Sequence, residues 1–379
     1  MIQNPILPGF CPDPSIIRVG EDYYIANSSF EWWPGVKIYH SKDLKHYEQL
    51  PSPLNRMSQL NMVGEGDSCG VWAPDISWDG EYFWLIYTDV KTRTGGLFNT
   101  HNYLVKSKDI RGGWSETVYL NSSGFDPSVF HDTDGKMYIV NMINNFKGIL
   151  VQEYDPMVTM ARSRSIWGPY EEDPGNPVLT SDVDNPEKLQ KCGHADLVCT
   201  QNGEWYMVHL CARPPKGSRQ CVLGRETAIQ KMLWNEEGWL RLACGGRFGQ
   251  WETEEPTGIQ EYLFPEEEGK DYGKEDFDLE IADGAGNNET AKNAVDEECD
   301  KKLSMPVKKT SALLDVRYTS LRQPYDSYTS LTERPGYLRL YGQESLNSCY
   351  NVSLVARRQQ DRYVQVETCV EFAPTCREQ

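Results

Sequence analysis

Hydrophobic and polar residues alternate along short stretches of the chain, and one pattern returns four times. These stretches are residues 13–26, 75–87, 126–140 and 194–208. Each begins at a polar residue, passes through an apolar run and a turn rich in Gly, Asp or Asn, and ends in a second run with bulky neighbours. A period of two residues indicates β-strands, and this turn chemistry indicates hairpins. Helical periodicity is almost absent.

A weaker element follows three of the hairpins, at residues 38–47, 103–114 and 159–170. One hairpin and one such element make about four strands, and four-stranded units that recur every 50 to 60 residues or so predict an all-β propeller. The order is uneven, however. An outer element ends at Pro156 and another begins at Met157. The hairpin that the pattern requires between them is missing, so the sequence predicts an incomplete blade.

The polar residues that lead the four hairpins are the first candidates for chemistry. Asp13, Asp75, Asp126 and His194 take equivalent places in the repeats and are therefore expected to converge on one central channel. Two carboxylates at a pocket are the minimum set for hydrolysis of a glycosidic bond. Asp13 lies between two prolines, which predicts a stiff, extended backbone. The alternative for this stretch is an ordinary turn before a strand.

Composition restricts the class of partner. The net charge of −18 argues against nucleic acids and anionic membranes, but not against neutral sugars. No apolar run is long enough for a membrane span, and the first residues do not resemble a secretion signal. The 11 cysteines lack metal-site spacing and indicate free thiols in a reducing compartment, so a cytoplasmic location is expected.

Seven motifs together support a resemblance. They are GFCPDPSI, DYYIANSSFEWWPGVKIYHSKDL, GVWAPDISW, FDPSVFHD, KCGHADLV, LGRETAIQK and LTERPGYLRLYG, and the resemblance that they support runs from residue 3 to about residue 372. The chain resembles glycoside hydrolase family 43, and most closely its β-xylosidases. The resemblance implies a five-bladed propeller and an inverting exo-β-1,4-xylosidase that acts on xylo-oligosaccharides, with α-L-arabinofuranosidase activity also open. It implies no required cofactor.

The resemblance also implies roles for three charged residues. Asp13 corresponds to the general base, Asp126 to the residue that modulates and orients the general acid, and Arg225 to an arginine that steadies the base. An ion pair of Arg225 with Glu226 or another acid is the structural alternative. Asp75 is expected to be a structural hydrogen-bonding residue rather than a catalytic one.

Three further residues are carried over by the resemblance. Phe30 and Trp72 correspond to the walls of the subsite for the non-reducing xylose, with an ordinary core position as the alternative. His194 corresponds to the histidine at the propeller axis, where some members hold a structural calcium ion. Its alternative is a buried histidine with satisfied hydrogen bonds, and no other metal site is expected.

The general acid of the family is a Glu at the head of the hairpin that is missing here. Glu153 belongs to an outer strand, whereas Glu171 and Glu172 are expected in a loop, so no residue receives this role. Acid catalysis contributes typically 10²–10⁴-fold. The alternatives to an active enzyme are a non-catalytic or crippled xylo-oligosaccharide-binding remnant and a poorly folding chain.

Composition also suggests the domain boundaries. Residues 1–251 are expected to form the propeller, 252–311 an acidic linker or insertion, and 312–379 the first part of a β-sandwich. Strand patterns lie at 311–321, 336–342, 351–359 and 363–372. In the family this sandwich lends a residue that caps the pocket, and the cap is expected to be absent. The oligomeric state is not determined, and a homo-oligomer is open.

Overall fold

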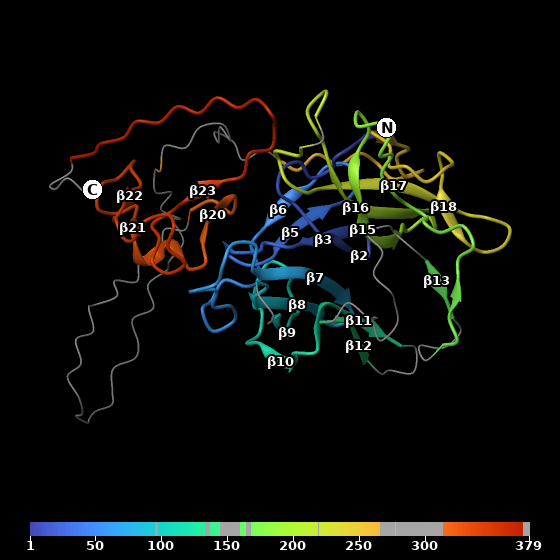
Figure 1. Ribbon diagram of the computed structural model, residues 1–379, viewed down its shortest axis with the longest axis horizontal. Coiled ribbons are helices and arrows are strands. Elements are labelled where there is room, and N and C mark those ends of the chain that lie inside the picture. The colour runs from blue at the N-terminus through green and yellow to red at the C-terminus, as the bar shows by residue number, and fades with distance from the viewer. Residues whose placement is uncertain are drawn as a thin grey trace.

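The computed structural model describes residues 1–94, 98–132, 137–144, 160–163, 168–218, 220–265, 277 and 314–373. The chain is all-β across these residues (Figure 1), and the single helical element among them is the short 3₁₀ turn η1 (Tyr325–Ser327). No helix in this part of the chain has the length and apolar character that a membrane span needs.

Three antiparallel sheets contain four strands each, and their strands neighbour one another in chain order. The sheets are β2 (Ser15–Val19) with β3 (Asp22–Asn27), β5 (Lys37–Ser41) and β6 (Glu48–Leu50); β7 (Gly70–Trp78) with β8 (Phe83–Thr92), β9 (Asn99–Ser107) and β10 (Val118–Asn121); and β15 (Gln190–Cys199) with β16 (Trp205–Ala212), β17 (Glu226–Trp234) and β18 (Leu240–Leu242). Gly20 and Gly80 supply the positive φ angles, 65° and 102°, that the tight turns of the first two hairpins require. The predicted hairpins are confirmed.

The third repeat shows only a hairpin in the described residues. It consists of β11 (Gly124–His131) and β12 (Met137–Ile143), and a separate pair follows it, β13 (Ala161–Arg162) with β14 (Glu171–Glu172). The expectation that Glu171 and Glu172 are loop residues is therefore wrong, because they pair with β13. The predicted gap between Pro156 and Met157, and Glu153 with it, lies outside the described residues.

The first strands of the repeats lie side by side around a centre. β15 contacts β2, β2 contacts β7, and β7 contacts β11. Apolar side chains fill the space between neighbouring sheets, as Ile38 of the first sheet and Leu85 of the second show in one buried cluster. At the other side β1 (Ile2–Gln3) pairs with β19 (Glu252–Thr253), which joins the beginning of this part of the chain to its end. The arrangement agrees with the predicted β-propeller.

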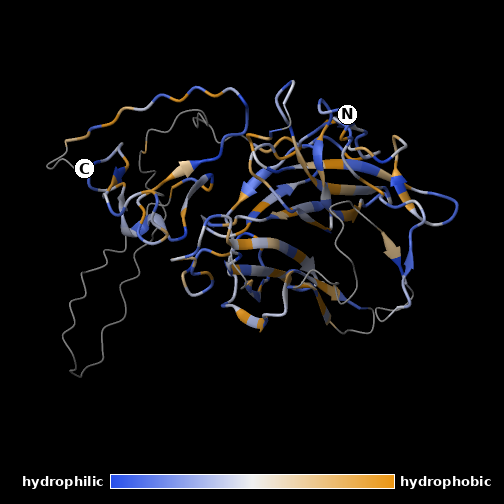
Figure 2. Cartoon of the chain, viewed as in Figure 1, coloured by the Kyte–Doolittle hydropathy of each residue, from blue (hydrophilic) through white to orange (hydrophobic). Residues whose placement is uncertain are grey.

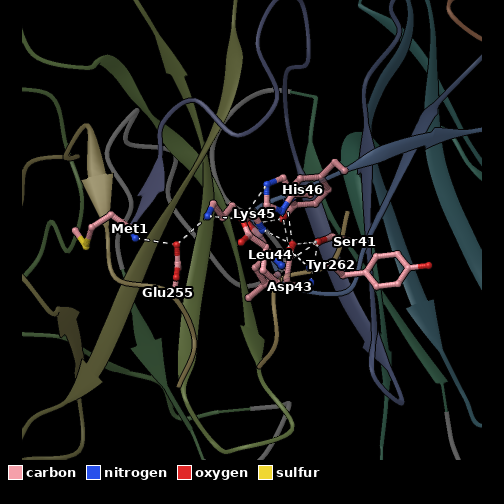
Figure 3. A network of polar contacts seen from close by, with 10 residues as sticks. Met1, Ser41, Asp43, Leu44, Lys45, His46, Glu255 and Tyr262 are labelled. Carbon is pink, nitrogen blue, oxygen red and sulfur yellow. Dashed lines mark hydrogen bonds and ion pairs between the residues drawn. The ribbon is translucent and has the colours of Figure 1, made fainter. Parts of the chain in front are cut away.

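A polar network ties the first sheet to the segment after β19 (Figure 3). The Asp43 carboxylate accepts hydrogen bonds from the backbone N–H groups of His46 and Tyr262, both at 2.8 Å. Beside it, Lys45 Nζ lies 3.1 Å from a Glu255 carboxylate oxygen. Burial alone would raise the pKa of Asp43, but these hydrogen bonds lower it below its ordinary value.

The C-terminal part adds short strands beside the propeller (Figure 1), and one of them pairs with it. β20 (Tyr318–Leu321) lies between β4 (Trp32–Trp33) and β23 (Ala356–Arg357), while β21 (Thr329–Ser330) pairs with β22 (Arg339–Leu340). The buried Arg322 fixes this contact, since its Nε donates to the Glu65 carbonyl at 2.6 Å and its Nη2 to Asp67 at 2.7 Å.

The prediction of a strand at 363–372 is wrong. This stretch has no paired strand and runs extended along the edge of the molecule, where its residues alternate between orange and blue in Figure 2. Val364, Val366, Val370 and Phe372 are all exposed. Alternation of apolar and polar residues predicts a strand only where a neighbouring strand accepts its hydrogen bonds, and the described residues supply none there.

Candidate active site

Each first strand has an unusual backbone at the same register. Asp13, Ala73, Asp126 and His194 have φ angles of 53°, 28°, 50° and 42°. Where these residues lie within β7, β11 and β15, the strand pairing shifts by a bulge at the same place. Non-glycine residues in this region are uncommon and concentrate at functional sites. The expected extended backbone of Asp13 is therefore wrong, because Asp13, two residues before β2, takes the same positive φ as the bulged residues despite the preference of a residue before proline.

This register corrects the alignment of the repeats. Asp75 lies two residues after Ala73, so it is equivalent to Ser15 and not to Asp13. Its carboxylate accepts hydrogen bonds from Ser15 Oγ at 2.9 Å, Ser128 Oγ at 3.1 Å and Val129 N at 3.0 Å. Asp75 thus connects three first strands. It is a structural hydrogen-bonding residue, as the sequence predicts.

The free energy of unfolding should depend on pH through Asp75. Burial, and then the charge of Asp196, raise the pKa of Asp75 from 3.8 to about 7, so the folded chain holds this proton more tightly than the unfolded chain. As the pH rises from about 4 to 7, Asp75 should lower the stability of the fold by up to about 1.4 kcal/mol per pH unit. Urea unfolding at several pH values should show this slope reduced in Asp75→Asn.

Asp109→Asn, the same change of charge at an exposed position, is the control for that measurement. A slope that is identical in the wild type and in Asp75→Asn would contradict the role given to this carboxyl group.

Asp13 is buried and held from two sides. Ser28 Oγ donates to its Oδ2 at 2.7 Å, and Arg225 Nη1 donates to its Oδ1 at 2.8 Å. Ser28 Oγ also accepts the N–H of Ala73 at 2.7 Å, which anchors it to the second sheet. The alternative ion pair of Arg225 with Glu226 is not formed in the structure, because Glu226 is bonded by Arg213 instead.

Asp126 faces the same centre and is electrostatically coupled to Asp13. Burial raises the pKa of Asp126 to about 6; the Asp13 charge adds to this effect, while His194 and Arg225 oppose it. His194 is exposed, so its alternative as a buried, satisfied histidine is wrong. The structure thus brings Asp13, Asp126, Arg225 and His194 together.

Aromatic rings form one side of this centre. Phe30 is buried, the partly buried Trp72 lies 5.9 Å from it between ring centroids, and the Arg225 guanidinium lies 4.9 Å from the Phe30 centroid. Phe10 and Phe125 extend the wall, at 5.6 Å from Phe30 and 5.9 Å from Trp72. Sequence reasoning missed both rings. The corrected register would have found Phe125, because it precedes Asp126 just as Trp72 precedes Ala73.

A cavity of about 560 Å³ opens beside this centre, and Arg225 connects the two, since it lines the cavity and bonds Asp13. The other lining residues come from the loops of the propeller and from the C-terminal part: Phe10, Phe30, Glu31, Trp32, Ser68, Val222, Leu223, Gly224, Thr319, Ala356, Arg357, Arg358 and Gln359. The C-terminal part therefore forms a wall of this cavity, whereas the expected absence of the capping residue stays a prediction. A second hollow, lined by Tyr82 and Lys106 among others, contains none of the predicted site residues.

The structural calcium ion that the resemblance associates with the neighbourhood of His194 stays a prediction. Calcium takes six to eight oxygen ligands, whereas His194 offers an imidazole nitrogen. The described residues contain no group of three or more His, Cys, Asp or Glu side chains that could hold a metal ion.

Comparison with known proteins identifies the family. Residues 2–160 and 154–240 match the family described as glycosyl hydrolases family 43. The chain belongs to family 43. Residues 310–379 also match a domain described as a beta xylosidase C-terminal concanavalin A-like domain.

Similar proteins carry related names. A xylosidase/arabinosidase 43B of Humicola insolens is 39% identical over 426 residues, which cover 98% of this chain and 72% of that protein. A beta-xylosidase of Bacillus subtilis is 41% identical over 435 residues, covering 98% and 74%. The crystal structure of a xylan beta-1,4-xylosidase from Bacillus halodurans superposes with a TM-score of 0.82 at 44% identity, covering 95% of this chain and 72% of that one.

These comparisons bear on the predicted gap. The alignments of 426 and 435 residues are longer than the whole chain of 379, so the family 43 relatives hold internal residues that this chain lacks. The family match breaks into two pieces that meet at 154–160, the region where the repeat pattern loses its hairpin.

Proposed function

We propose that this family 43 chain is an inverting exo-β-1,4-xylosidase that removes terminal xylose from xylo-oligosaccharides, with α-L-arabinofuranosidase activity as a second specificity. The observation that carries the proposal is the Asp13 carboxylate, fixed by Ser28 and Arg225 beside Asp126 and next to an aromatic wall. The names of the relatives supply the substrate class.

Each residue of the centre has a role in this proposal. Asp13 takes a proton from the attacking water as general base, and Arg225 orients the carboxylate through its hydrogen bond. Asp126 modulates and orients the general acid, the role that the resemblance gives it. Phe30 and Trp72 pack against the sugar ring. His194 is a polar group of the axis, near Asp126.

A crippled or non-catalytic sugar-binding protein is the second candidate. It is favoured by the break in the family match at 154–160, where the Glu that protonates the leaving oxygen is expected. A binding protein would keep Asp13 and the aromatic wall without turnover of ordinary glycosides.

The finer architecture belongs to the same proposal. We infer a five-bladed propeller with one incomplete blade over residues 1–251, an acidic linker at 252–311 and a partial sandwich at 312–379. Its support is the ring of first strands and the separate match of 310–379. A cytoplasmic location and a homo-oligomer stay predictions.

The proposal is tested with 4-nitrophenyl β-D-xyloside and 4-nitrophenyl α-L-arabinofuranoside. Nitrophenolate leaves without protonation, so release from the xyloside is expected even if the general acid is missing. Proton NMR of the first turnovers should show α-xylose, the inverted product. Binding of xylose without any release would favour the sugar-binding candidate, and β-xylose as the first product would contradict inversion.

A further inference from the structure

A segment of the C-terminal part, residues 356–362, crosses the loops that carry the active centre. We refer to it as the strap. Arg362 Nη2 donates to the Pro214 carbonyl at 3.0 Å, and Arg213 Nη2 donates to the Gln360 carbonyl at 3.1 Å. A Cβ atom at Gly9 would lie 2.6 Å from the Gln359 carbonyl oxygen, so the backbones meet where only glycine fits. The strap supplies the cavity residues 356–359.

One buried carboxylate holds the strap and the loop before Asp13 at the same time. Glu226 is fully buried. Its Oε1 accepts the N–H of Gly9 at 2.8 Å and Arg213 Nη2 at 2.8 Å, and its Oε2 accepts Arg213 Nε at 2.8 Å. The two-pronged geometry directs the remaining hydrogen of Arg213 Nη2 to Gln360.

Further hydrogen bonds join residues 225–227 to the loop that leads to Asp13. Cys11 donates its N–H to the Arg225 carbonyl at 2.9 Å, and Thr227 Oγ1 donates to the Cys11 carbonyl at 2.7 Å. The loop from Gly9 to Asp13 is therefore bonded by Arg225, Glu226 and Thr227 in turn. Arg225 then bonds the Asp13 carboxylate itself.

We propose that Arg213 and Glu226 form a positioning pair, which holds the strap as a wall of the cavity and the Asp13 loop in register with Arg225. Neither residue touches the reacting atoms. The pair acts on affinity, because a strap that is free to move leaves the sugar with an incomplete wall. The inference rests on the proposed function, in that the ligand of the cavity is a xylose unit.

The chain contains a matched ion pair that separates positioning from plain stability. Arg241 bonds Asp173 by two hydrogen bonds, at 2.5 Å and 2.7 Å. The Asp173 side chain is 0% and that of Arg241 28% exposed, against 0% for Glu226 and 20% for Arg213. None of the cavity residues belongs to this second pair.

The test compares Arg213→Gln with Arg241→Gln in the full chain. Hydrogen–deuterium exchange of residues 356–362 and calorimetric binding of xylose are measured for both. In Arg213→Gln we expect faster hydrogen exchange of the strap. We also expect the affinity for xylose to fall by about tenfold, within the range measured for residues that share one hydrogen-bond network. In Arg241→Gln we expect neither change. Equal effects in the two variants, or unchanged strap exchange in Arg213→Gln, would overturn the proposal.

Two provisions keep the test decisive. If Arg213→Gln does not fold, Arg213→Lys retains the charge opposite Glu226 but cannot also reach Gln360, so the strap should still exchange faster. If the wild-type chain binds no xylose, the proposed function fails, while the exchange measurement still decides whether the pair holds the strap.

Discussion

Asp13→Asn should reduce the hydrolysis of 4-nitrophenyl β-D-xyloside by about 10²–10⁴-fold, the usual contribution of a general base. Asparagine has the size of aspartate, and its one carboxamide oxygen can accept from Arg225 while its NH2 group can donate to Ser28 Oγ, so the fold and the binding of xylose should persist. What is lost is the group that takes the proton of the attacking water. The measurement is kcat/KM, together with the affinity for xylose.

Azide provides the control for this prediction. It is a nucleophile that needs no deprotonation, so it should restore part of the lost rate in Asp13→Asn and leave the wild-type rate nearly unchanged. A loss of less than about tenfold, below the range for acid–base catalysis, would remove Asp13 from the role of base.

Xylobiose should be cleaved far more slowly than the nitrophenyl substrate. Its leaving group is a sugar alkoxide, which departs only when protonated, and the segment expected to carry the acid is shortened here. Loss of acid catalysis should lower the ratio of kcat/KM for xylobiose to that for the nitrophenyl xyloside by about 10²–10⁴-fold. The Bacillus subtilis relative, assayed in parallel, supplies the reference ratio.

A ratio equal to that of the relative would show that another acid protonates the leaving group. Glu31 would then be the first residue to replace. It is the one acidic residue among the described residues that line the cavity, and burial raises its pKa above the ordinary value. Glu31→Gln should in that case reduce cleavage of xylobiose and spare the nitrophenyl substrate.

Much of the fold was predictable because its signals are local. Alternation and glycine turns such as the one at Gly20 locate each hairpin, and neither depends on distant contacts. The register of the central channel was not predictable in the same way. Asp75 was aligned with Asp13 by chemical likeness, whereas the backbone aligns Ala73 with it. An alanine side chain has no functional group that would single out this position in the sequence. The bulge that makes Ala73 equivalent to Asp126 is therefore recognised only in the folded sheet.

Two features of the site depend on tertiary contacts that a local pattern does not contain, and the resemblance implies the first of them. The pairing of Arg225 with Asp13 rather than with its neighbour Glu226 is decided by Arg213, which reaches Glu226 from another loop. Likewise, the sequence pattern at 351–359 predicts a strand but says nothing of its place beside the cavity. Contacts between residues so far apart in the chain leave no periodic signal.

The pairing of β1 with β19 has a consequence for folding of the chain during its synthesis on the ribosome. Ile2 pairs with Thr253, and Ile2, Ile6 and Leu7 share an apolar cluster with Val208 and Ile229. At roughly 5–20 residues per second, the first segment emerges about 10 to 50 seconds before its partners are synthesised. For that time its apolar side chains stay uncovered and open to chaperones. A pause in translation before residue 253 would therefore lengthen the period in which the nascent chain is prone to aggregate.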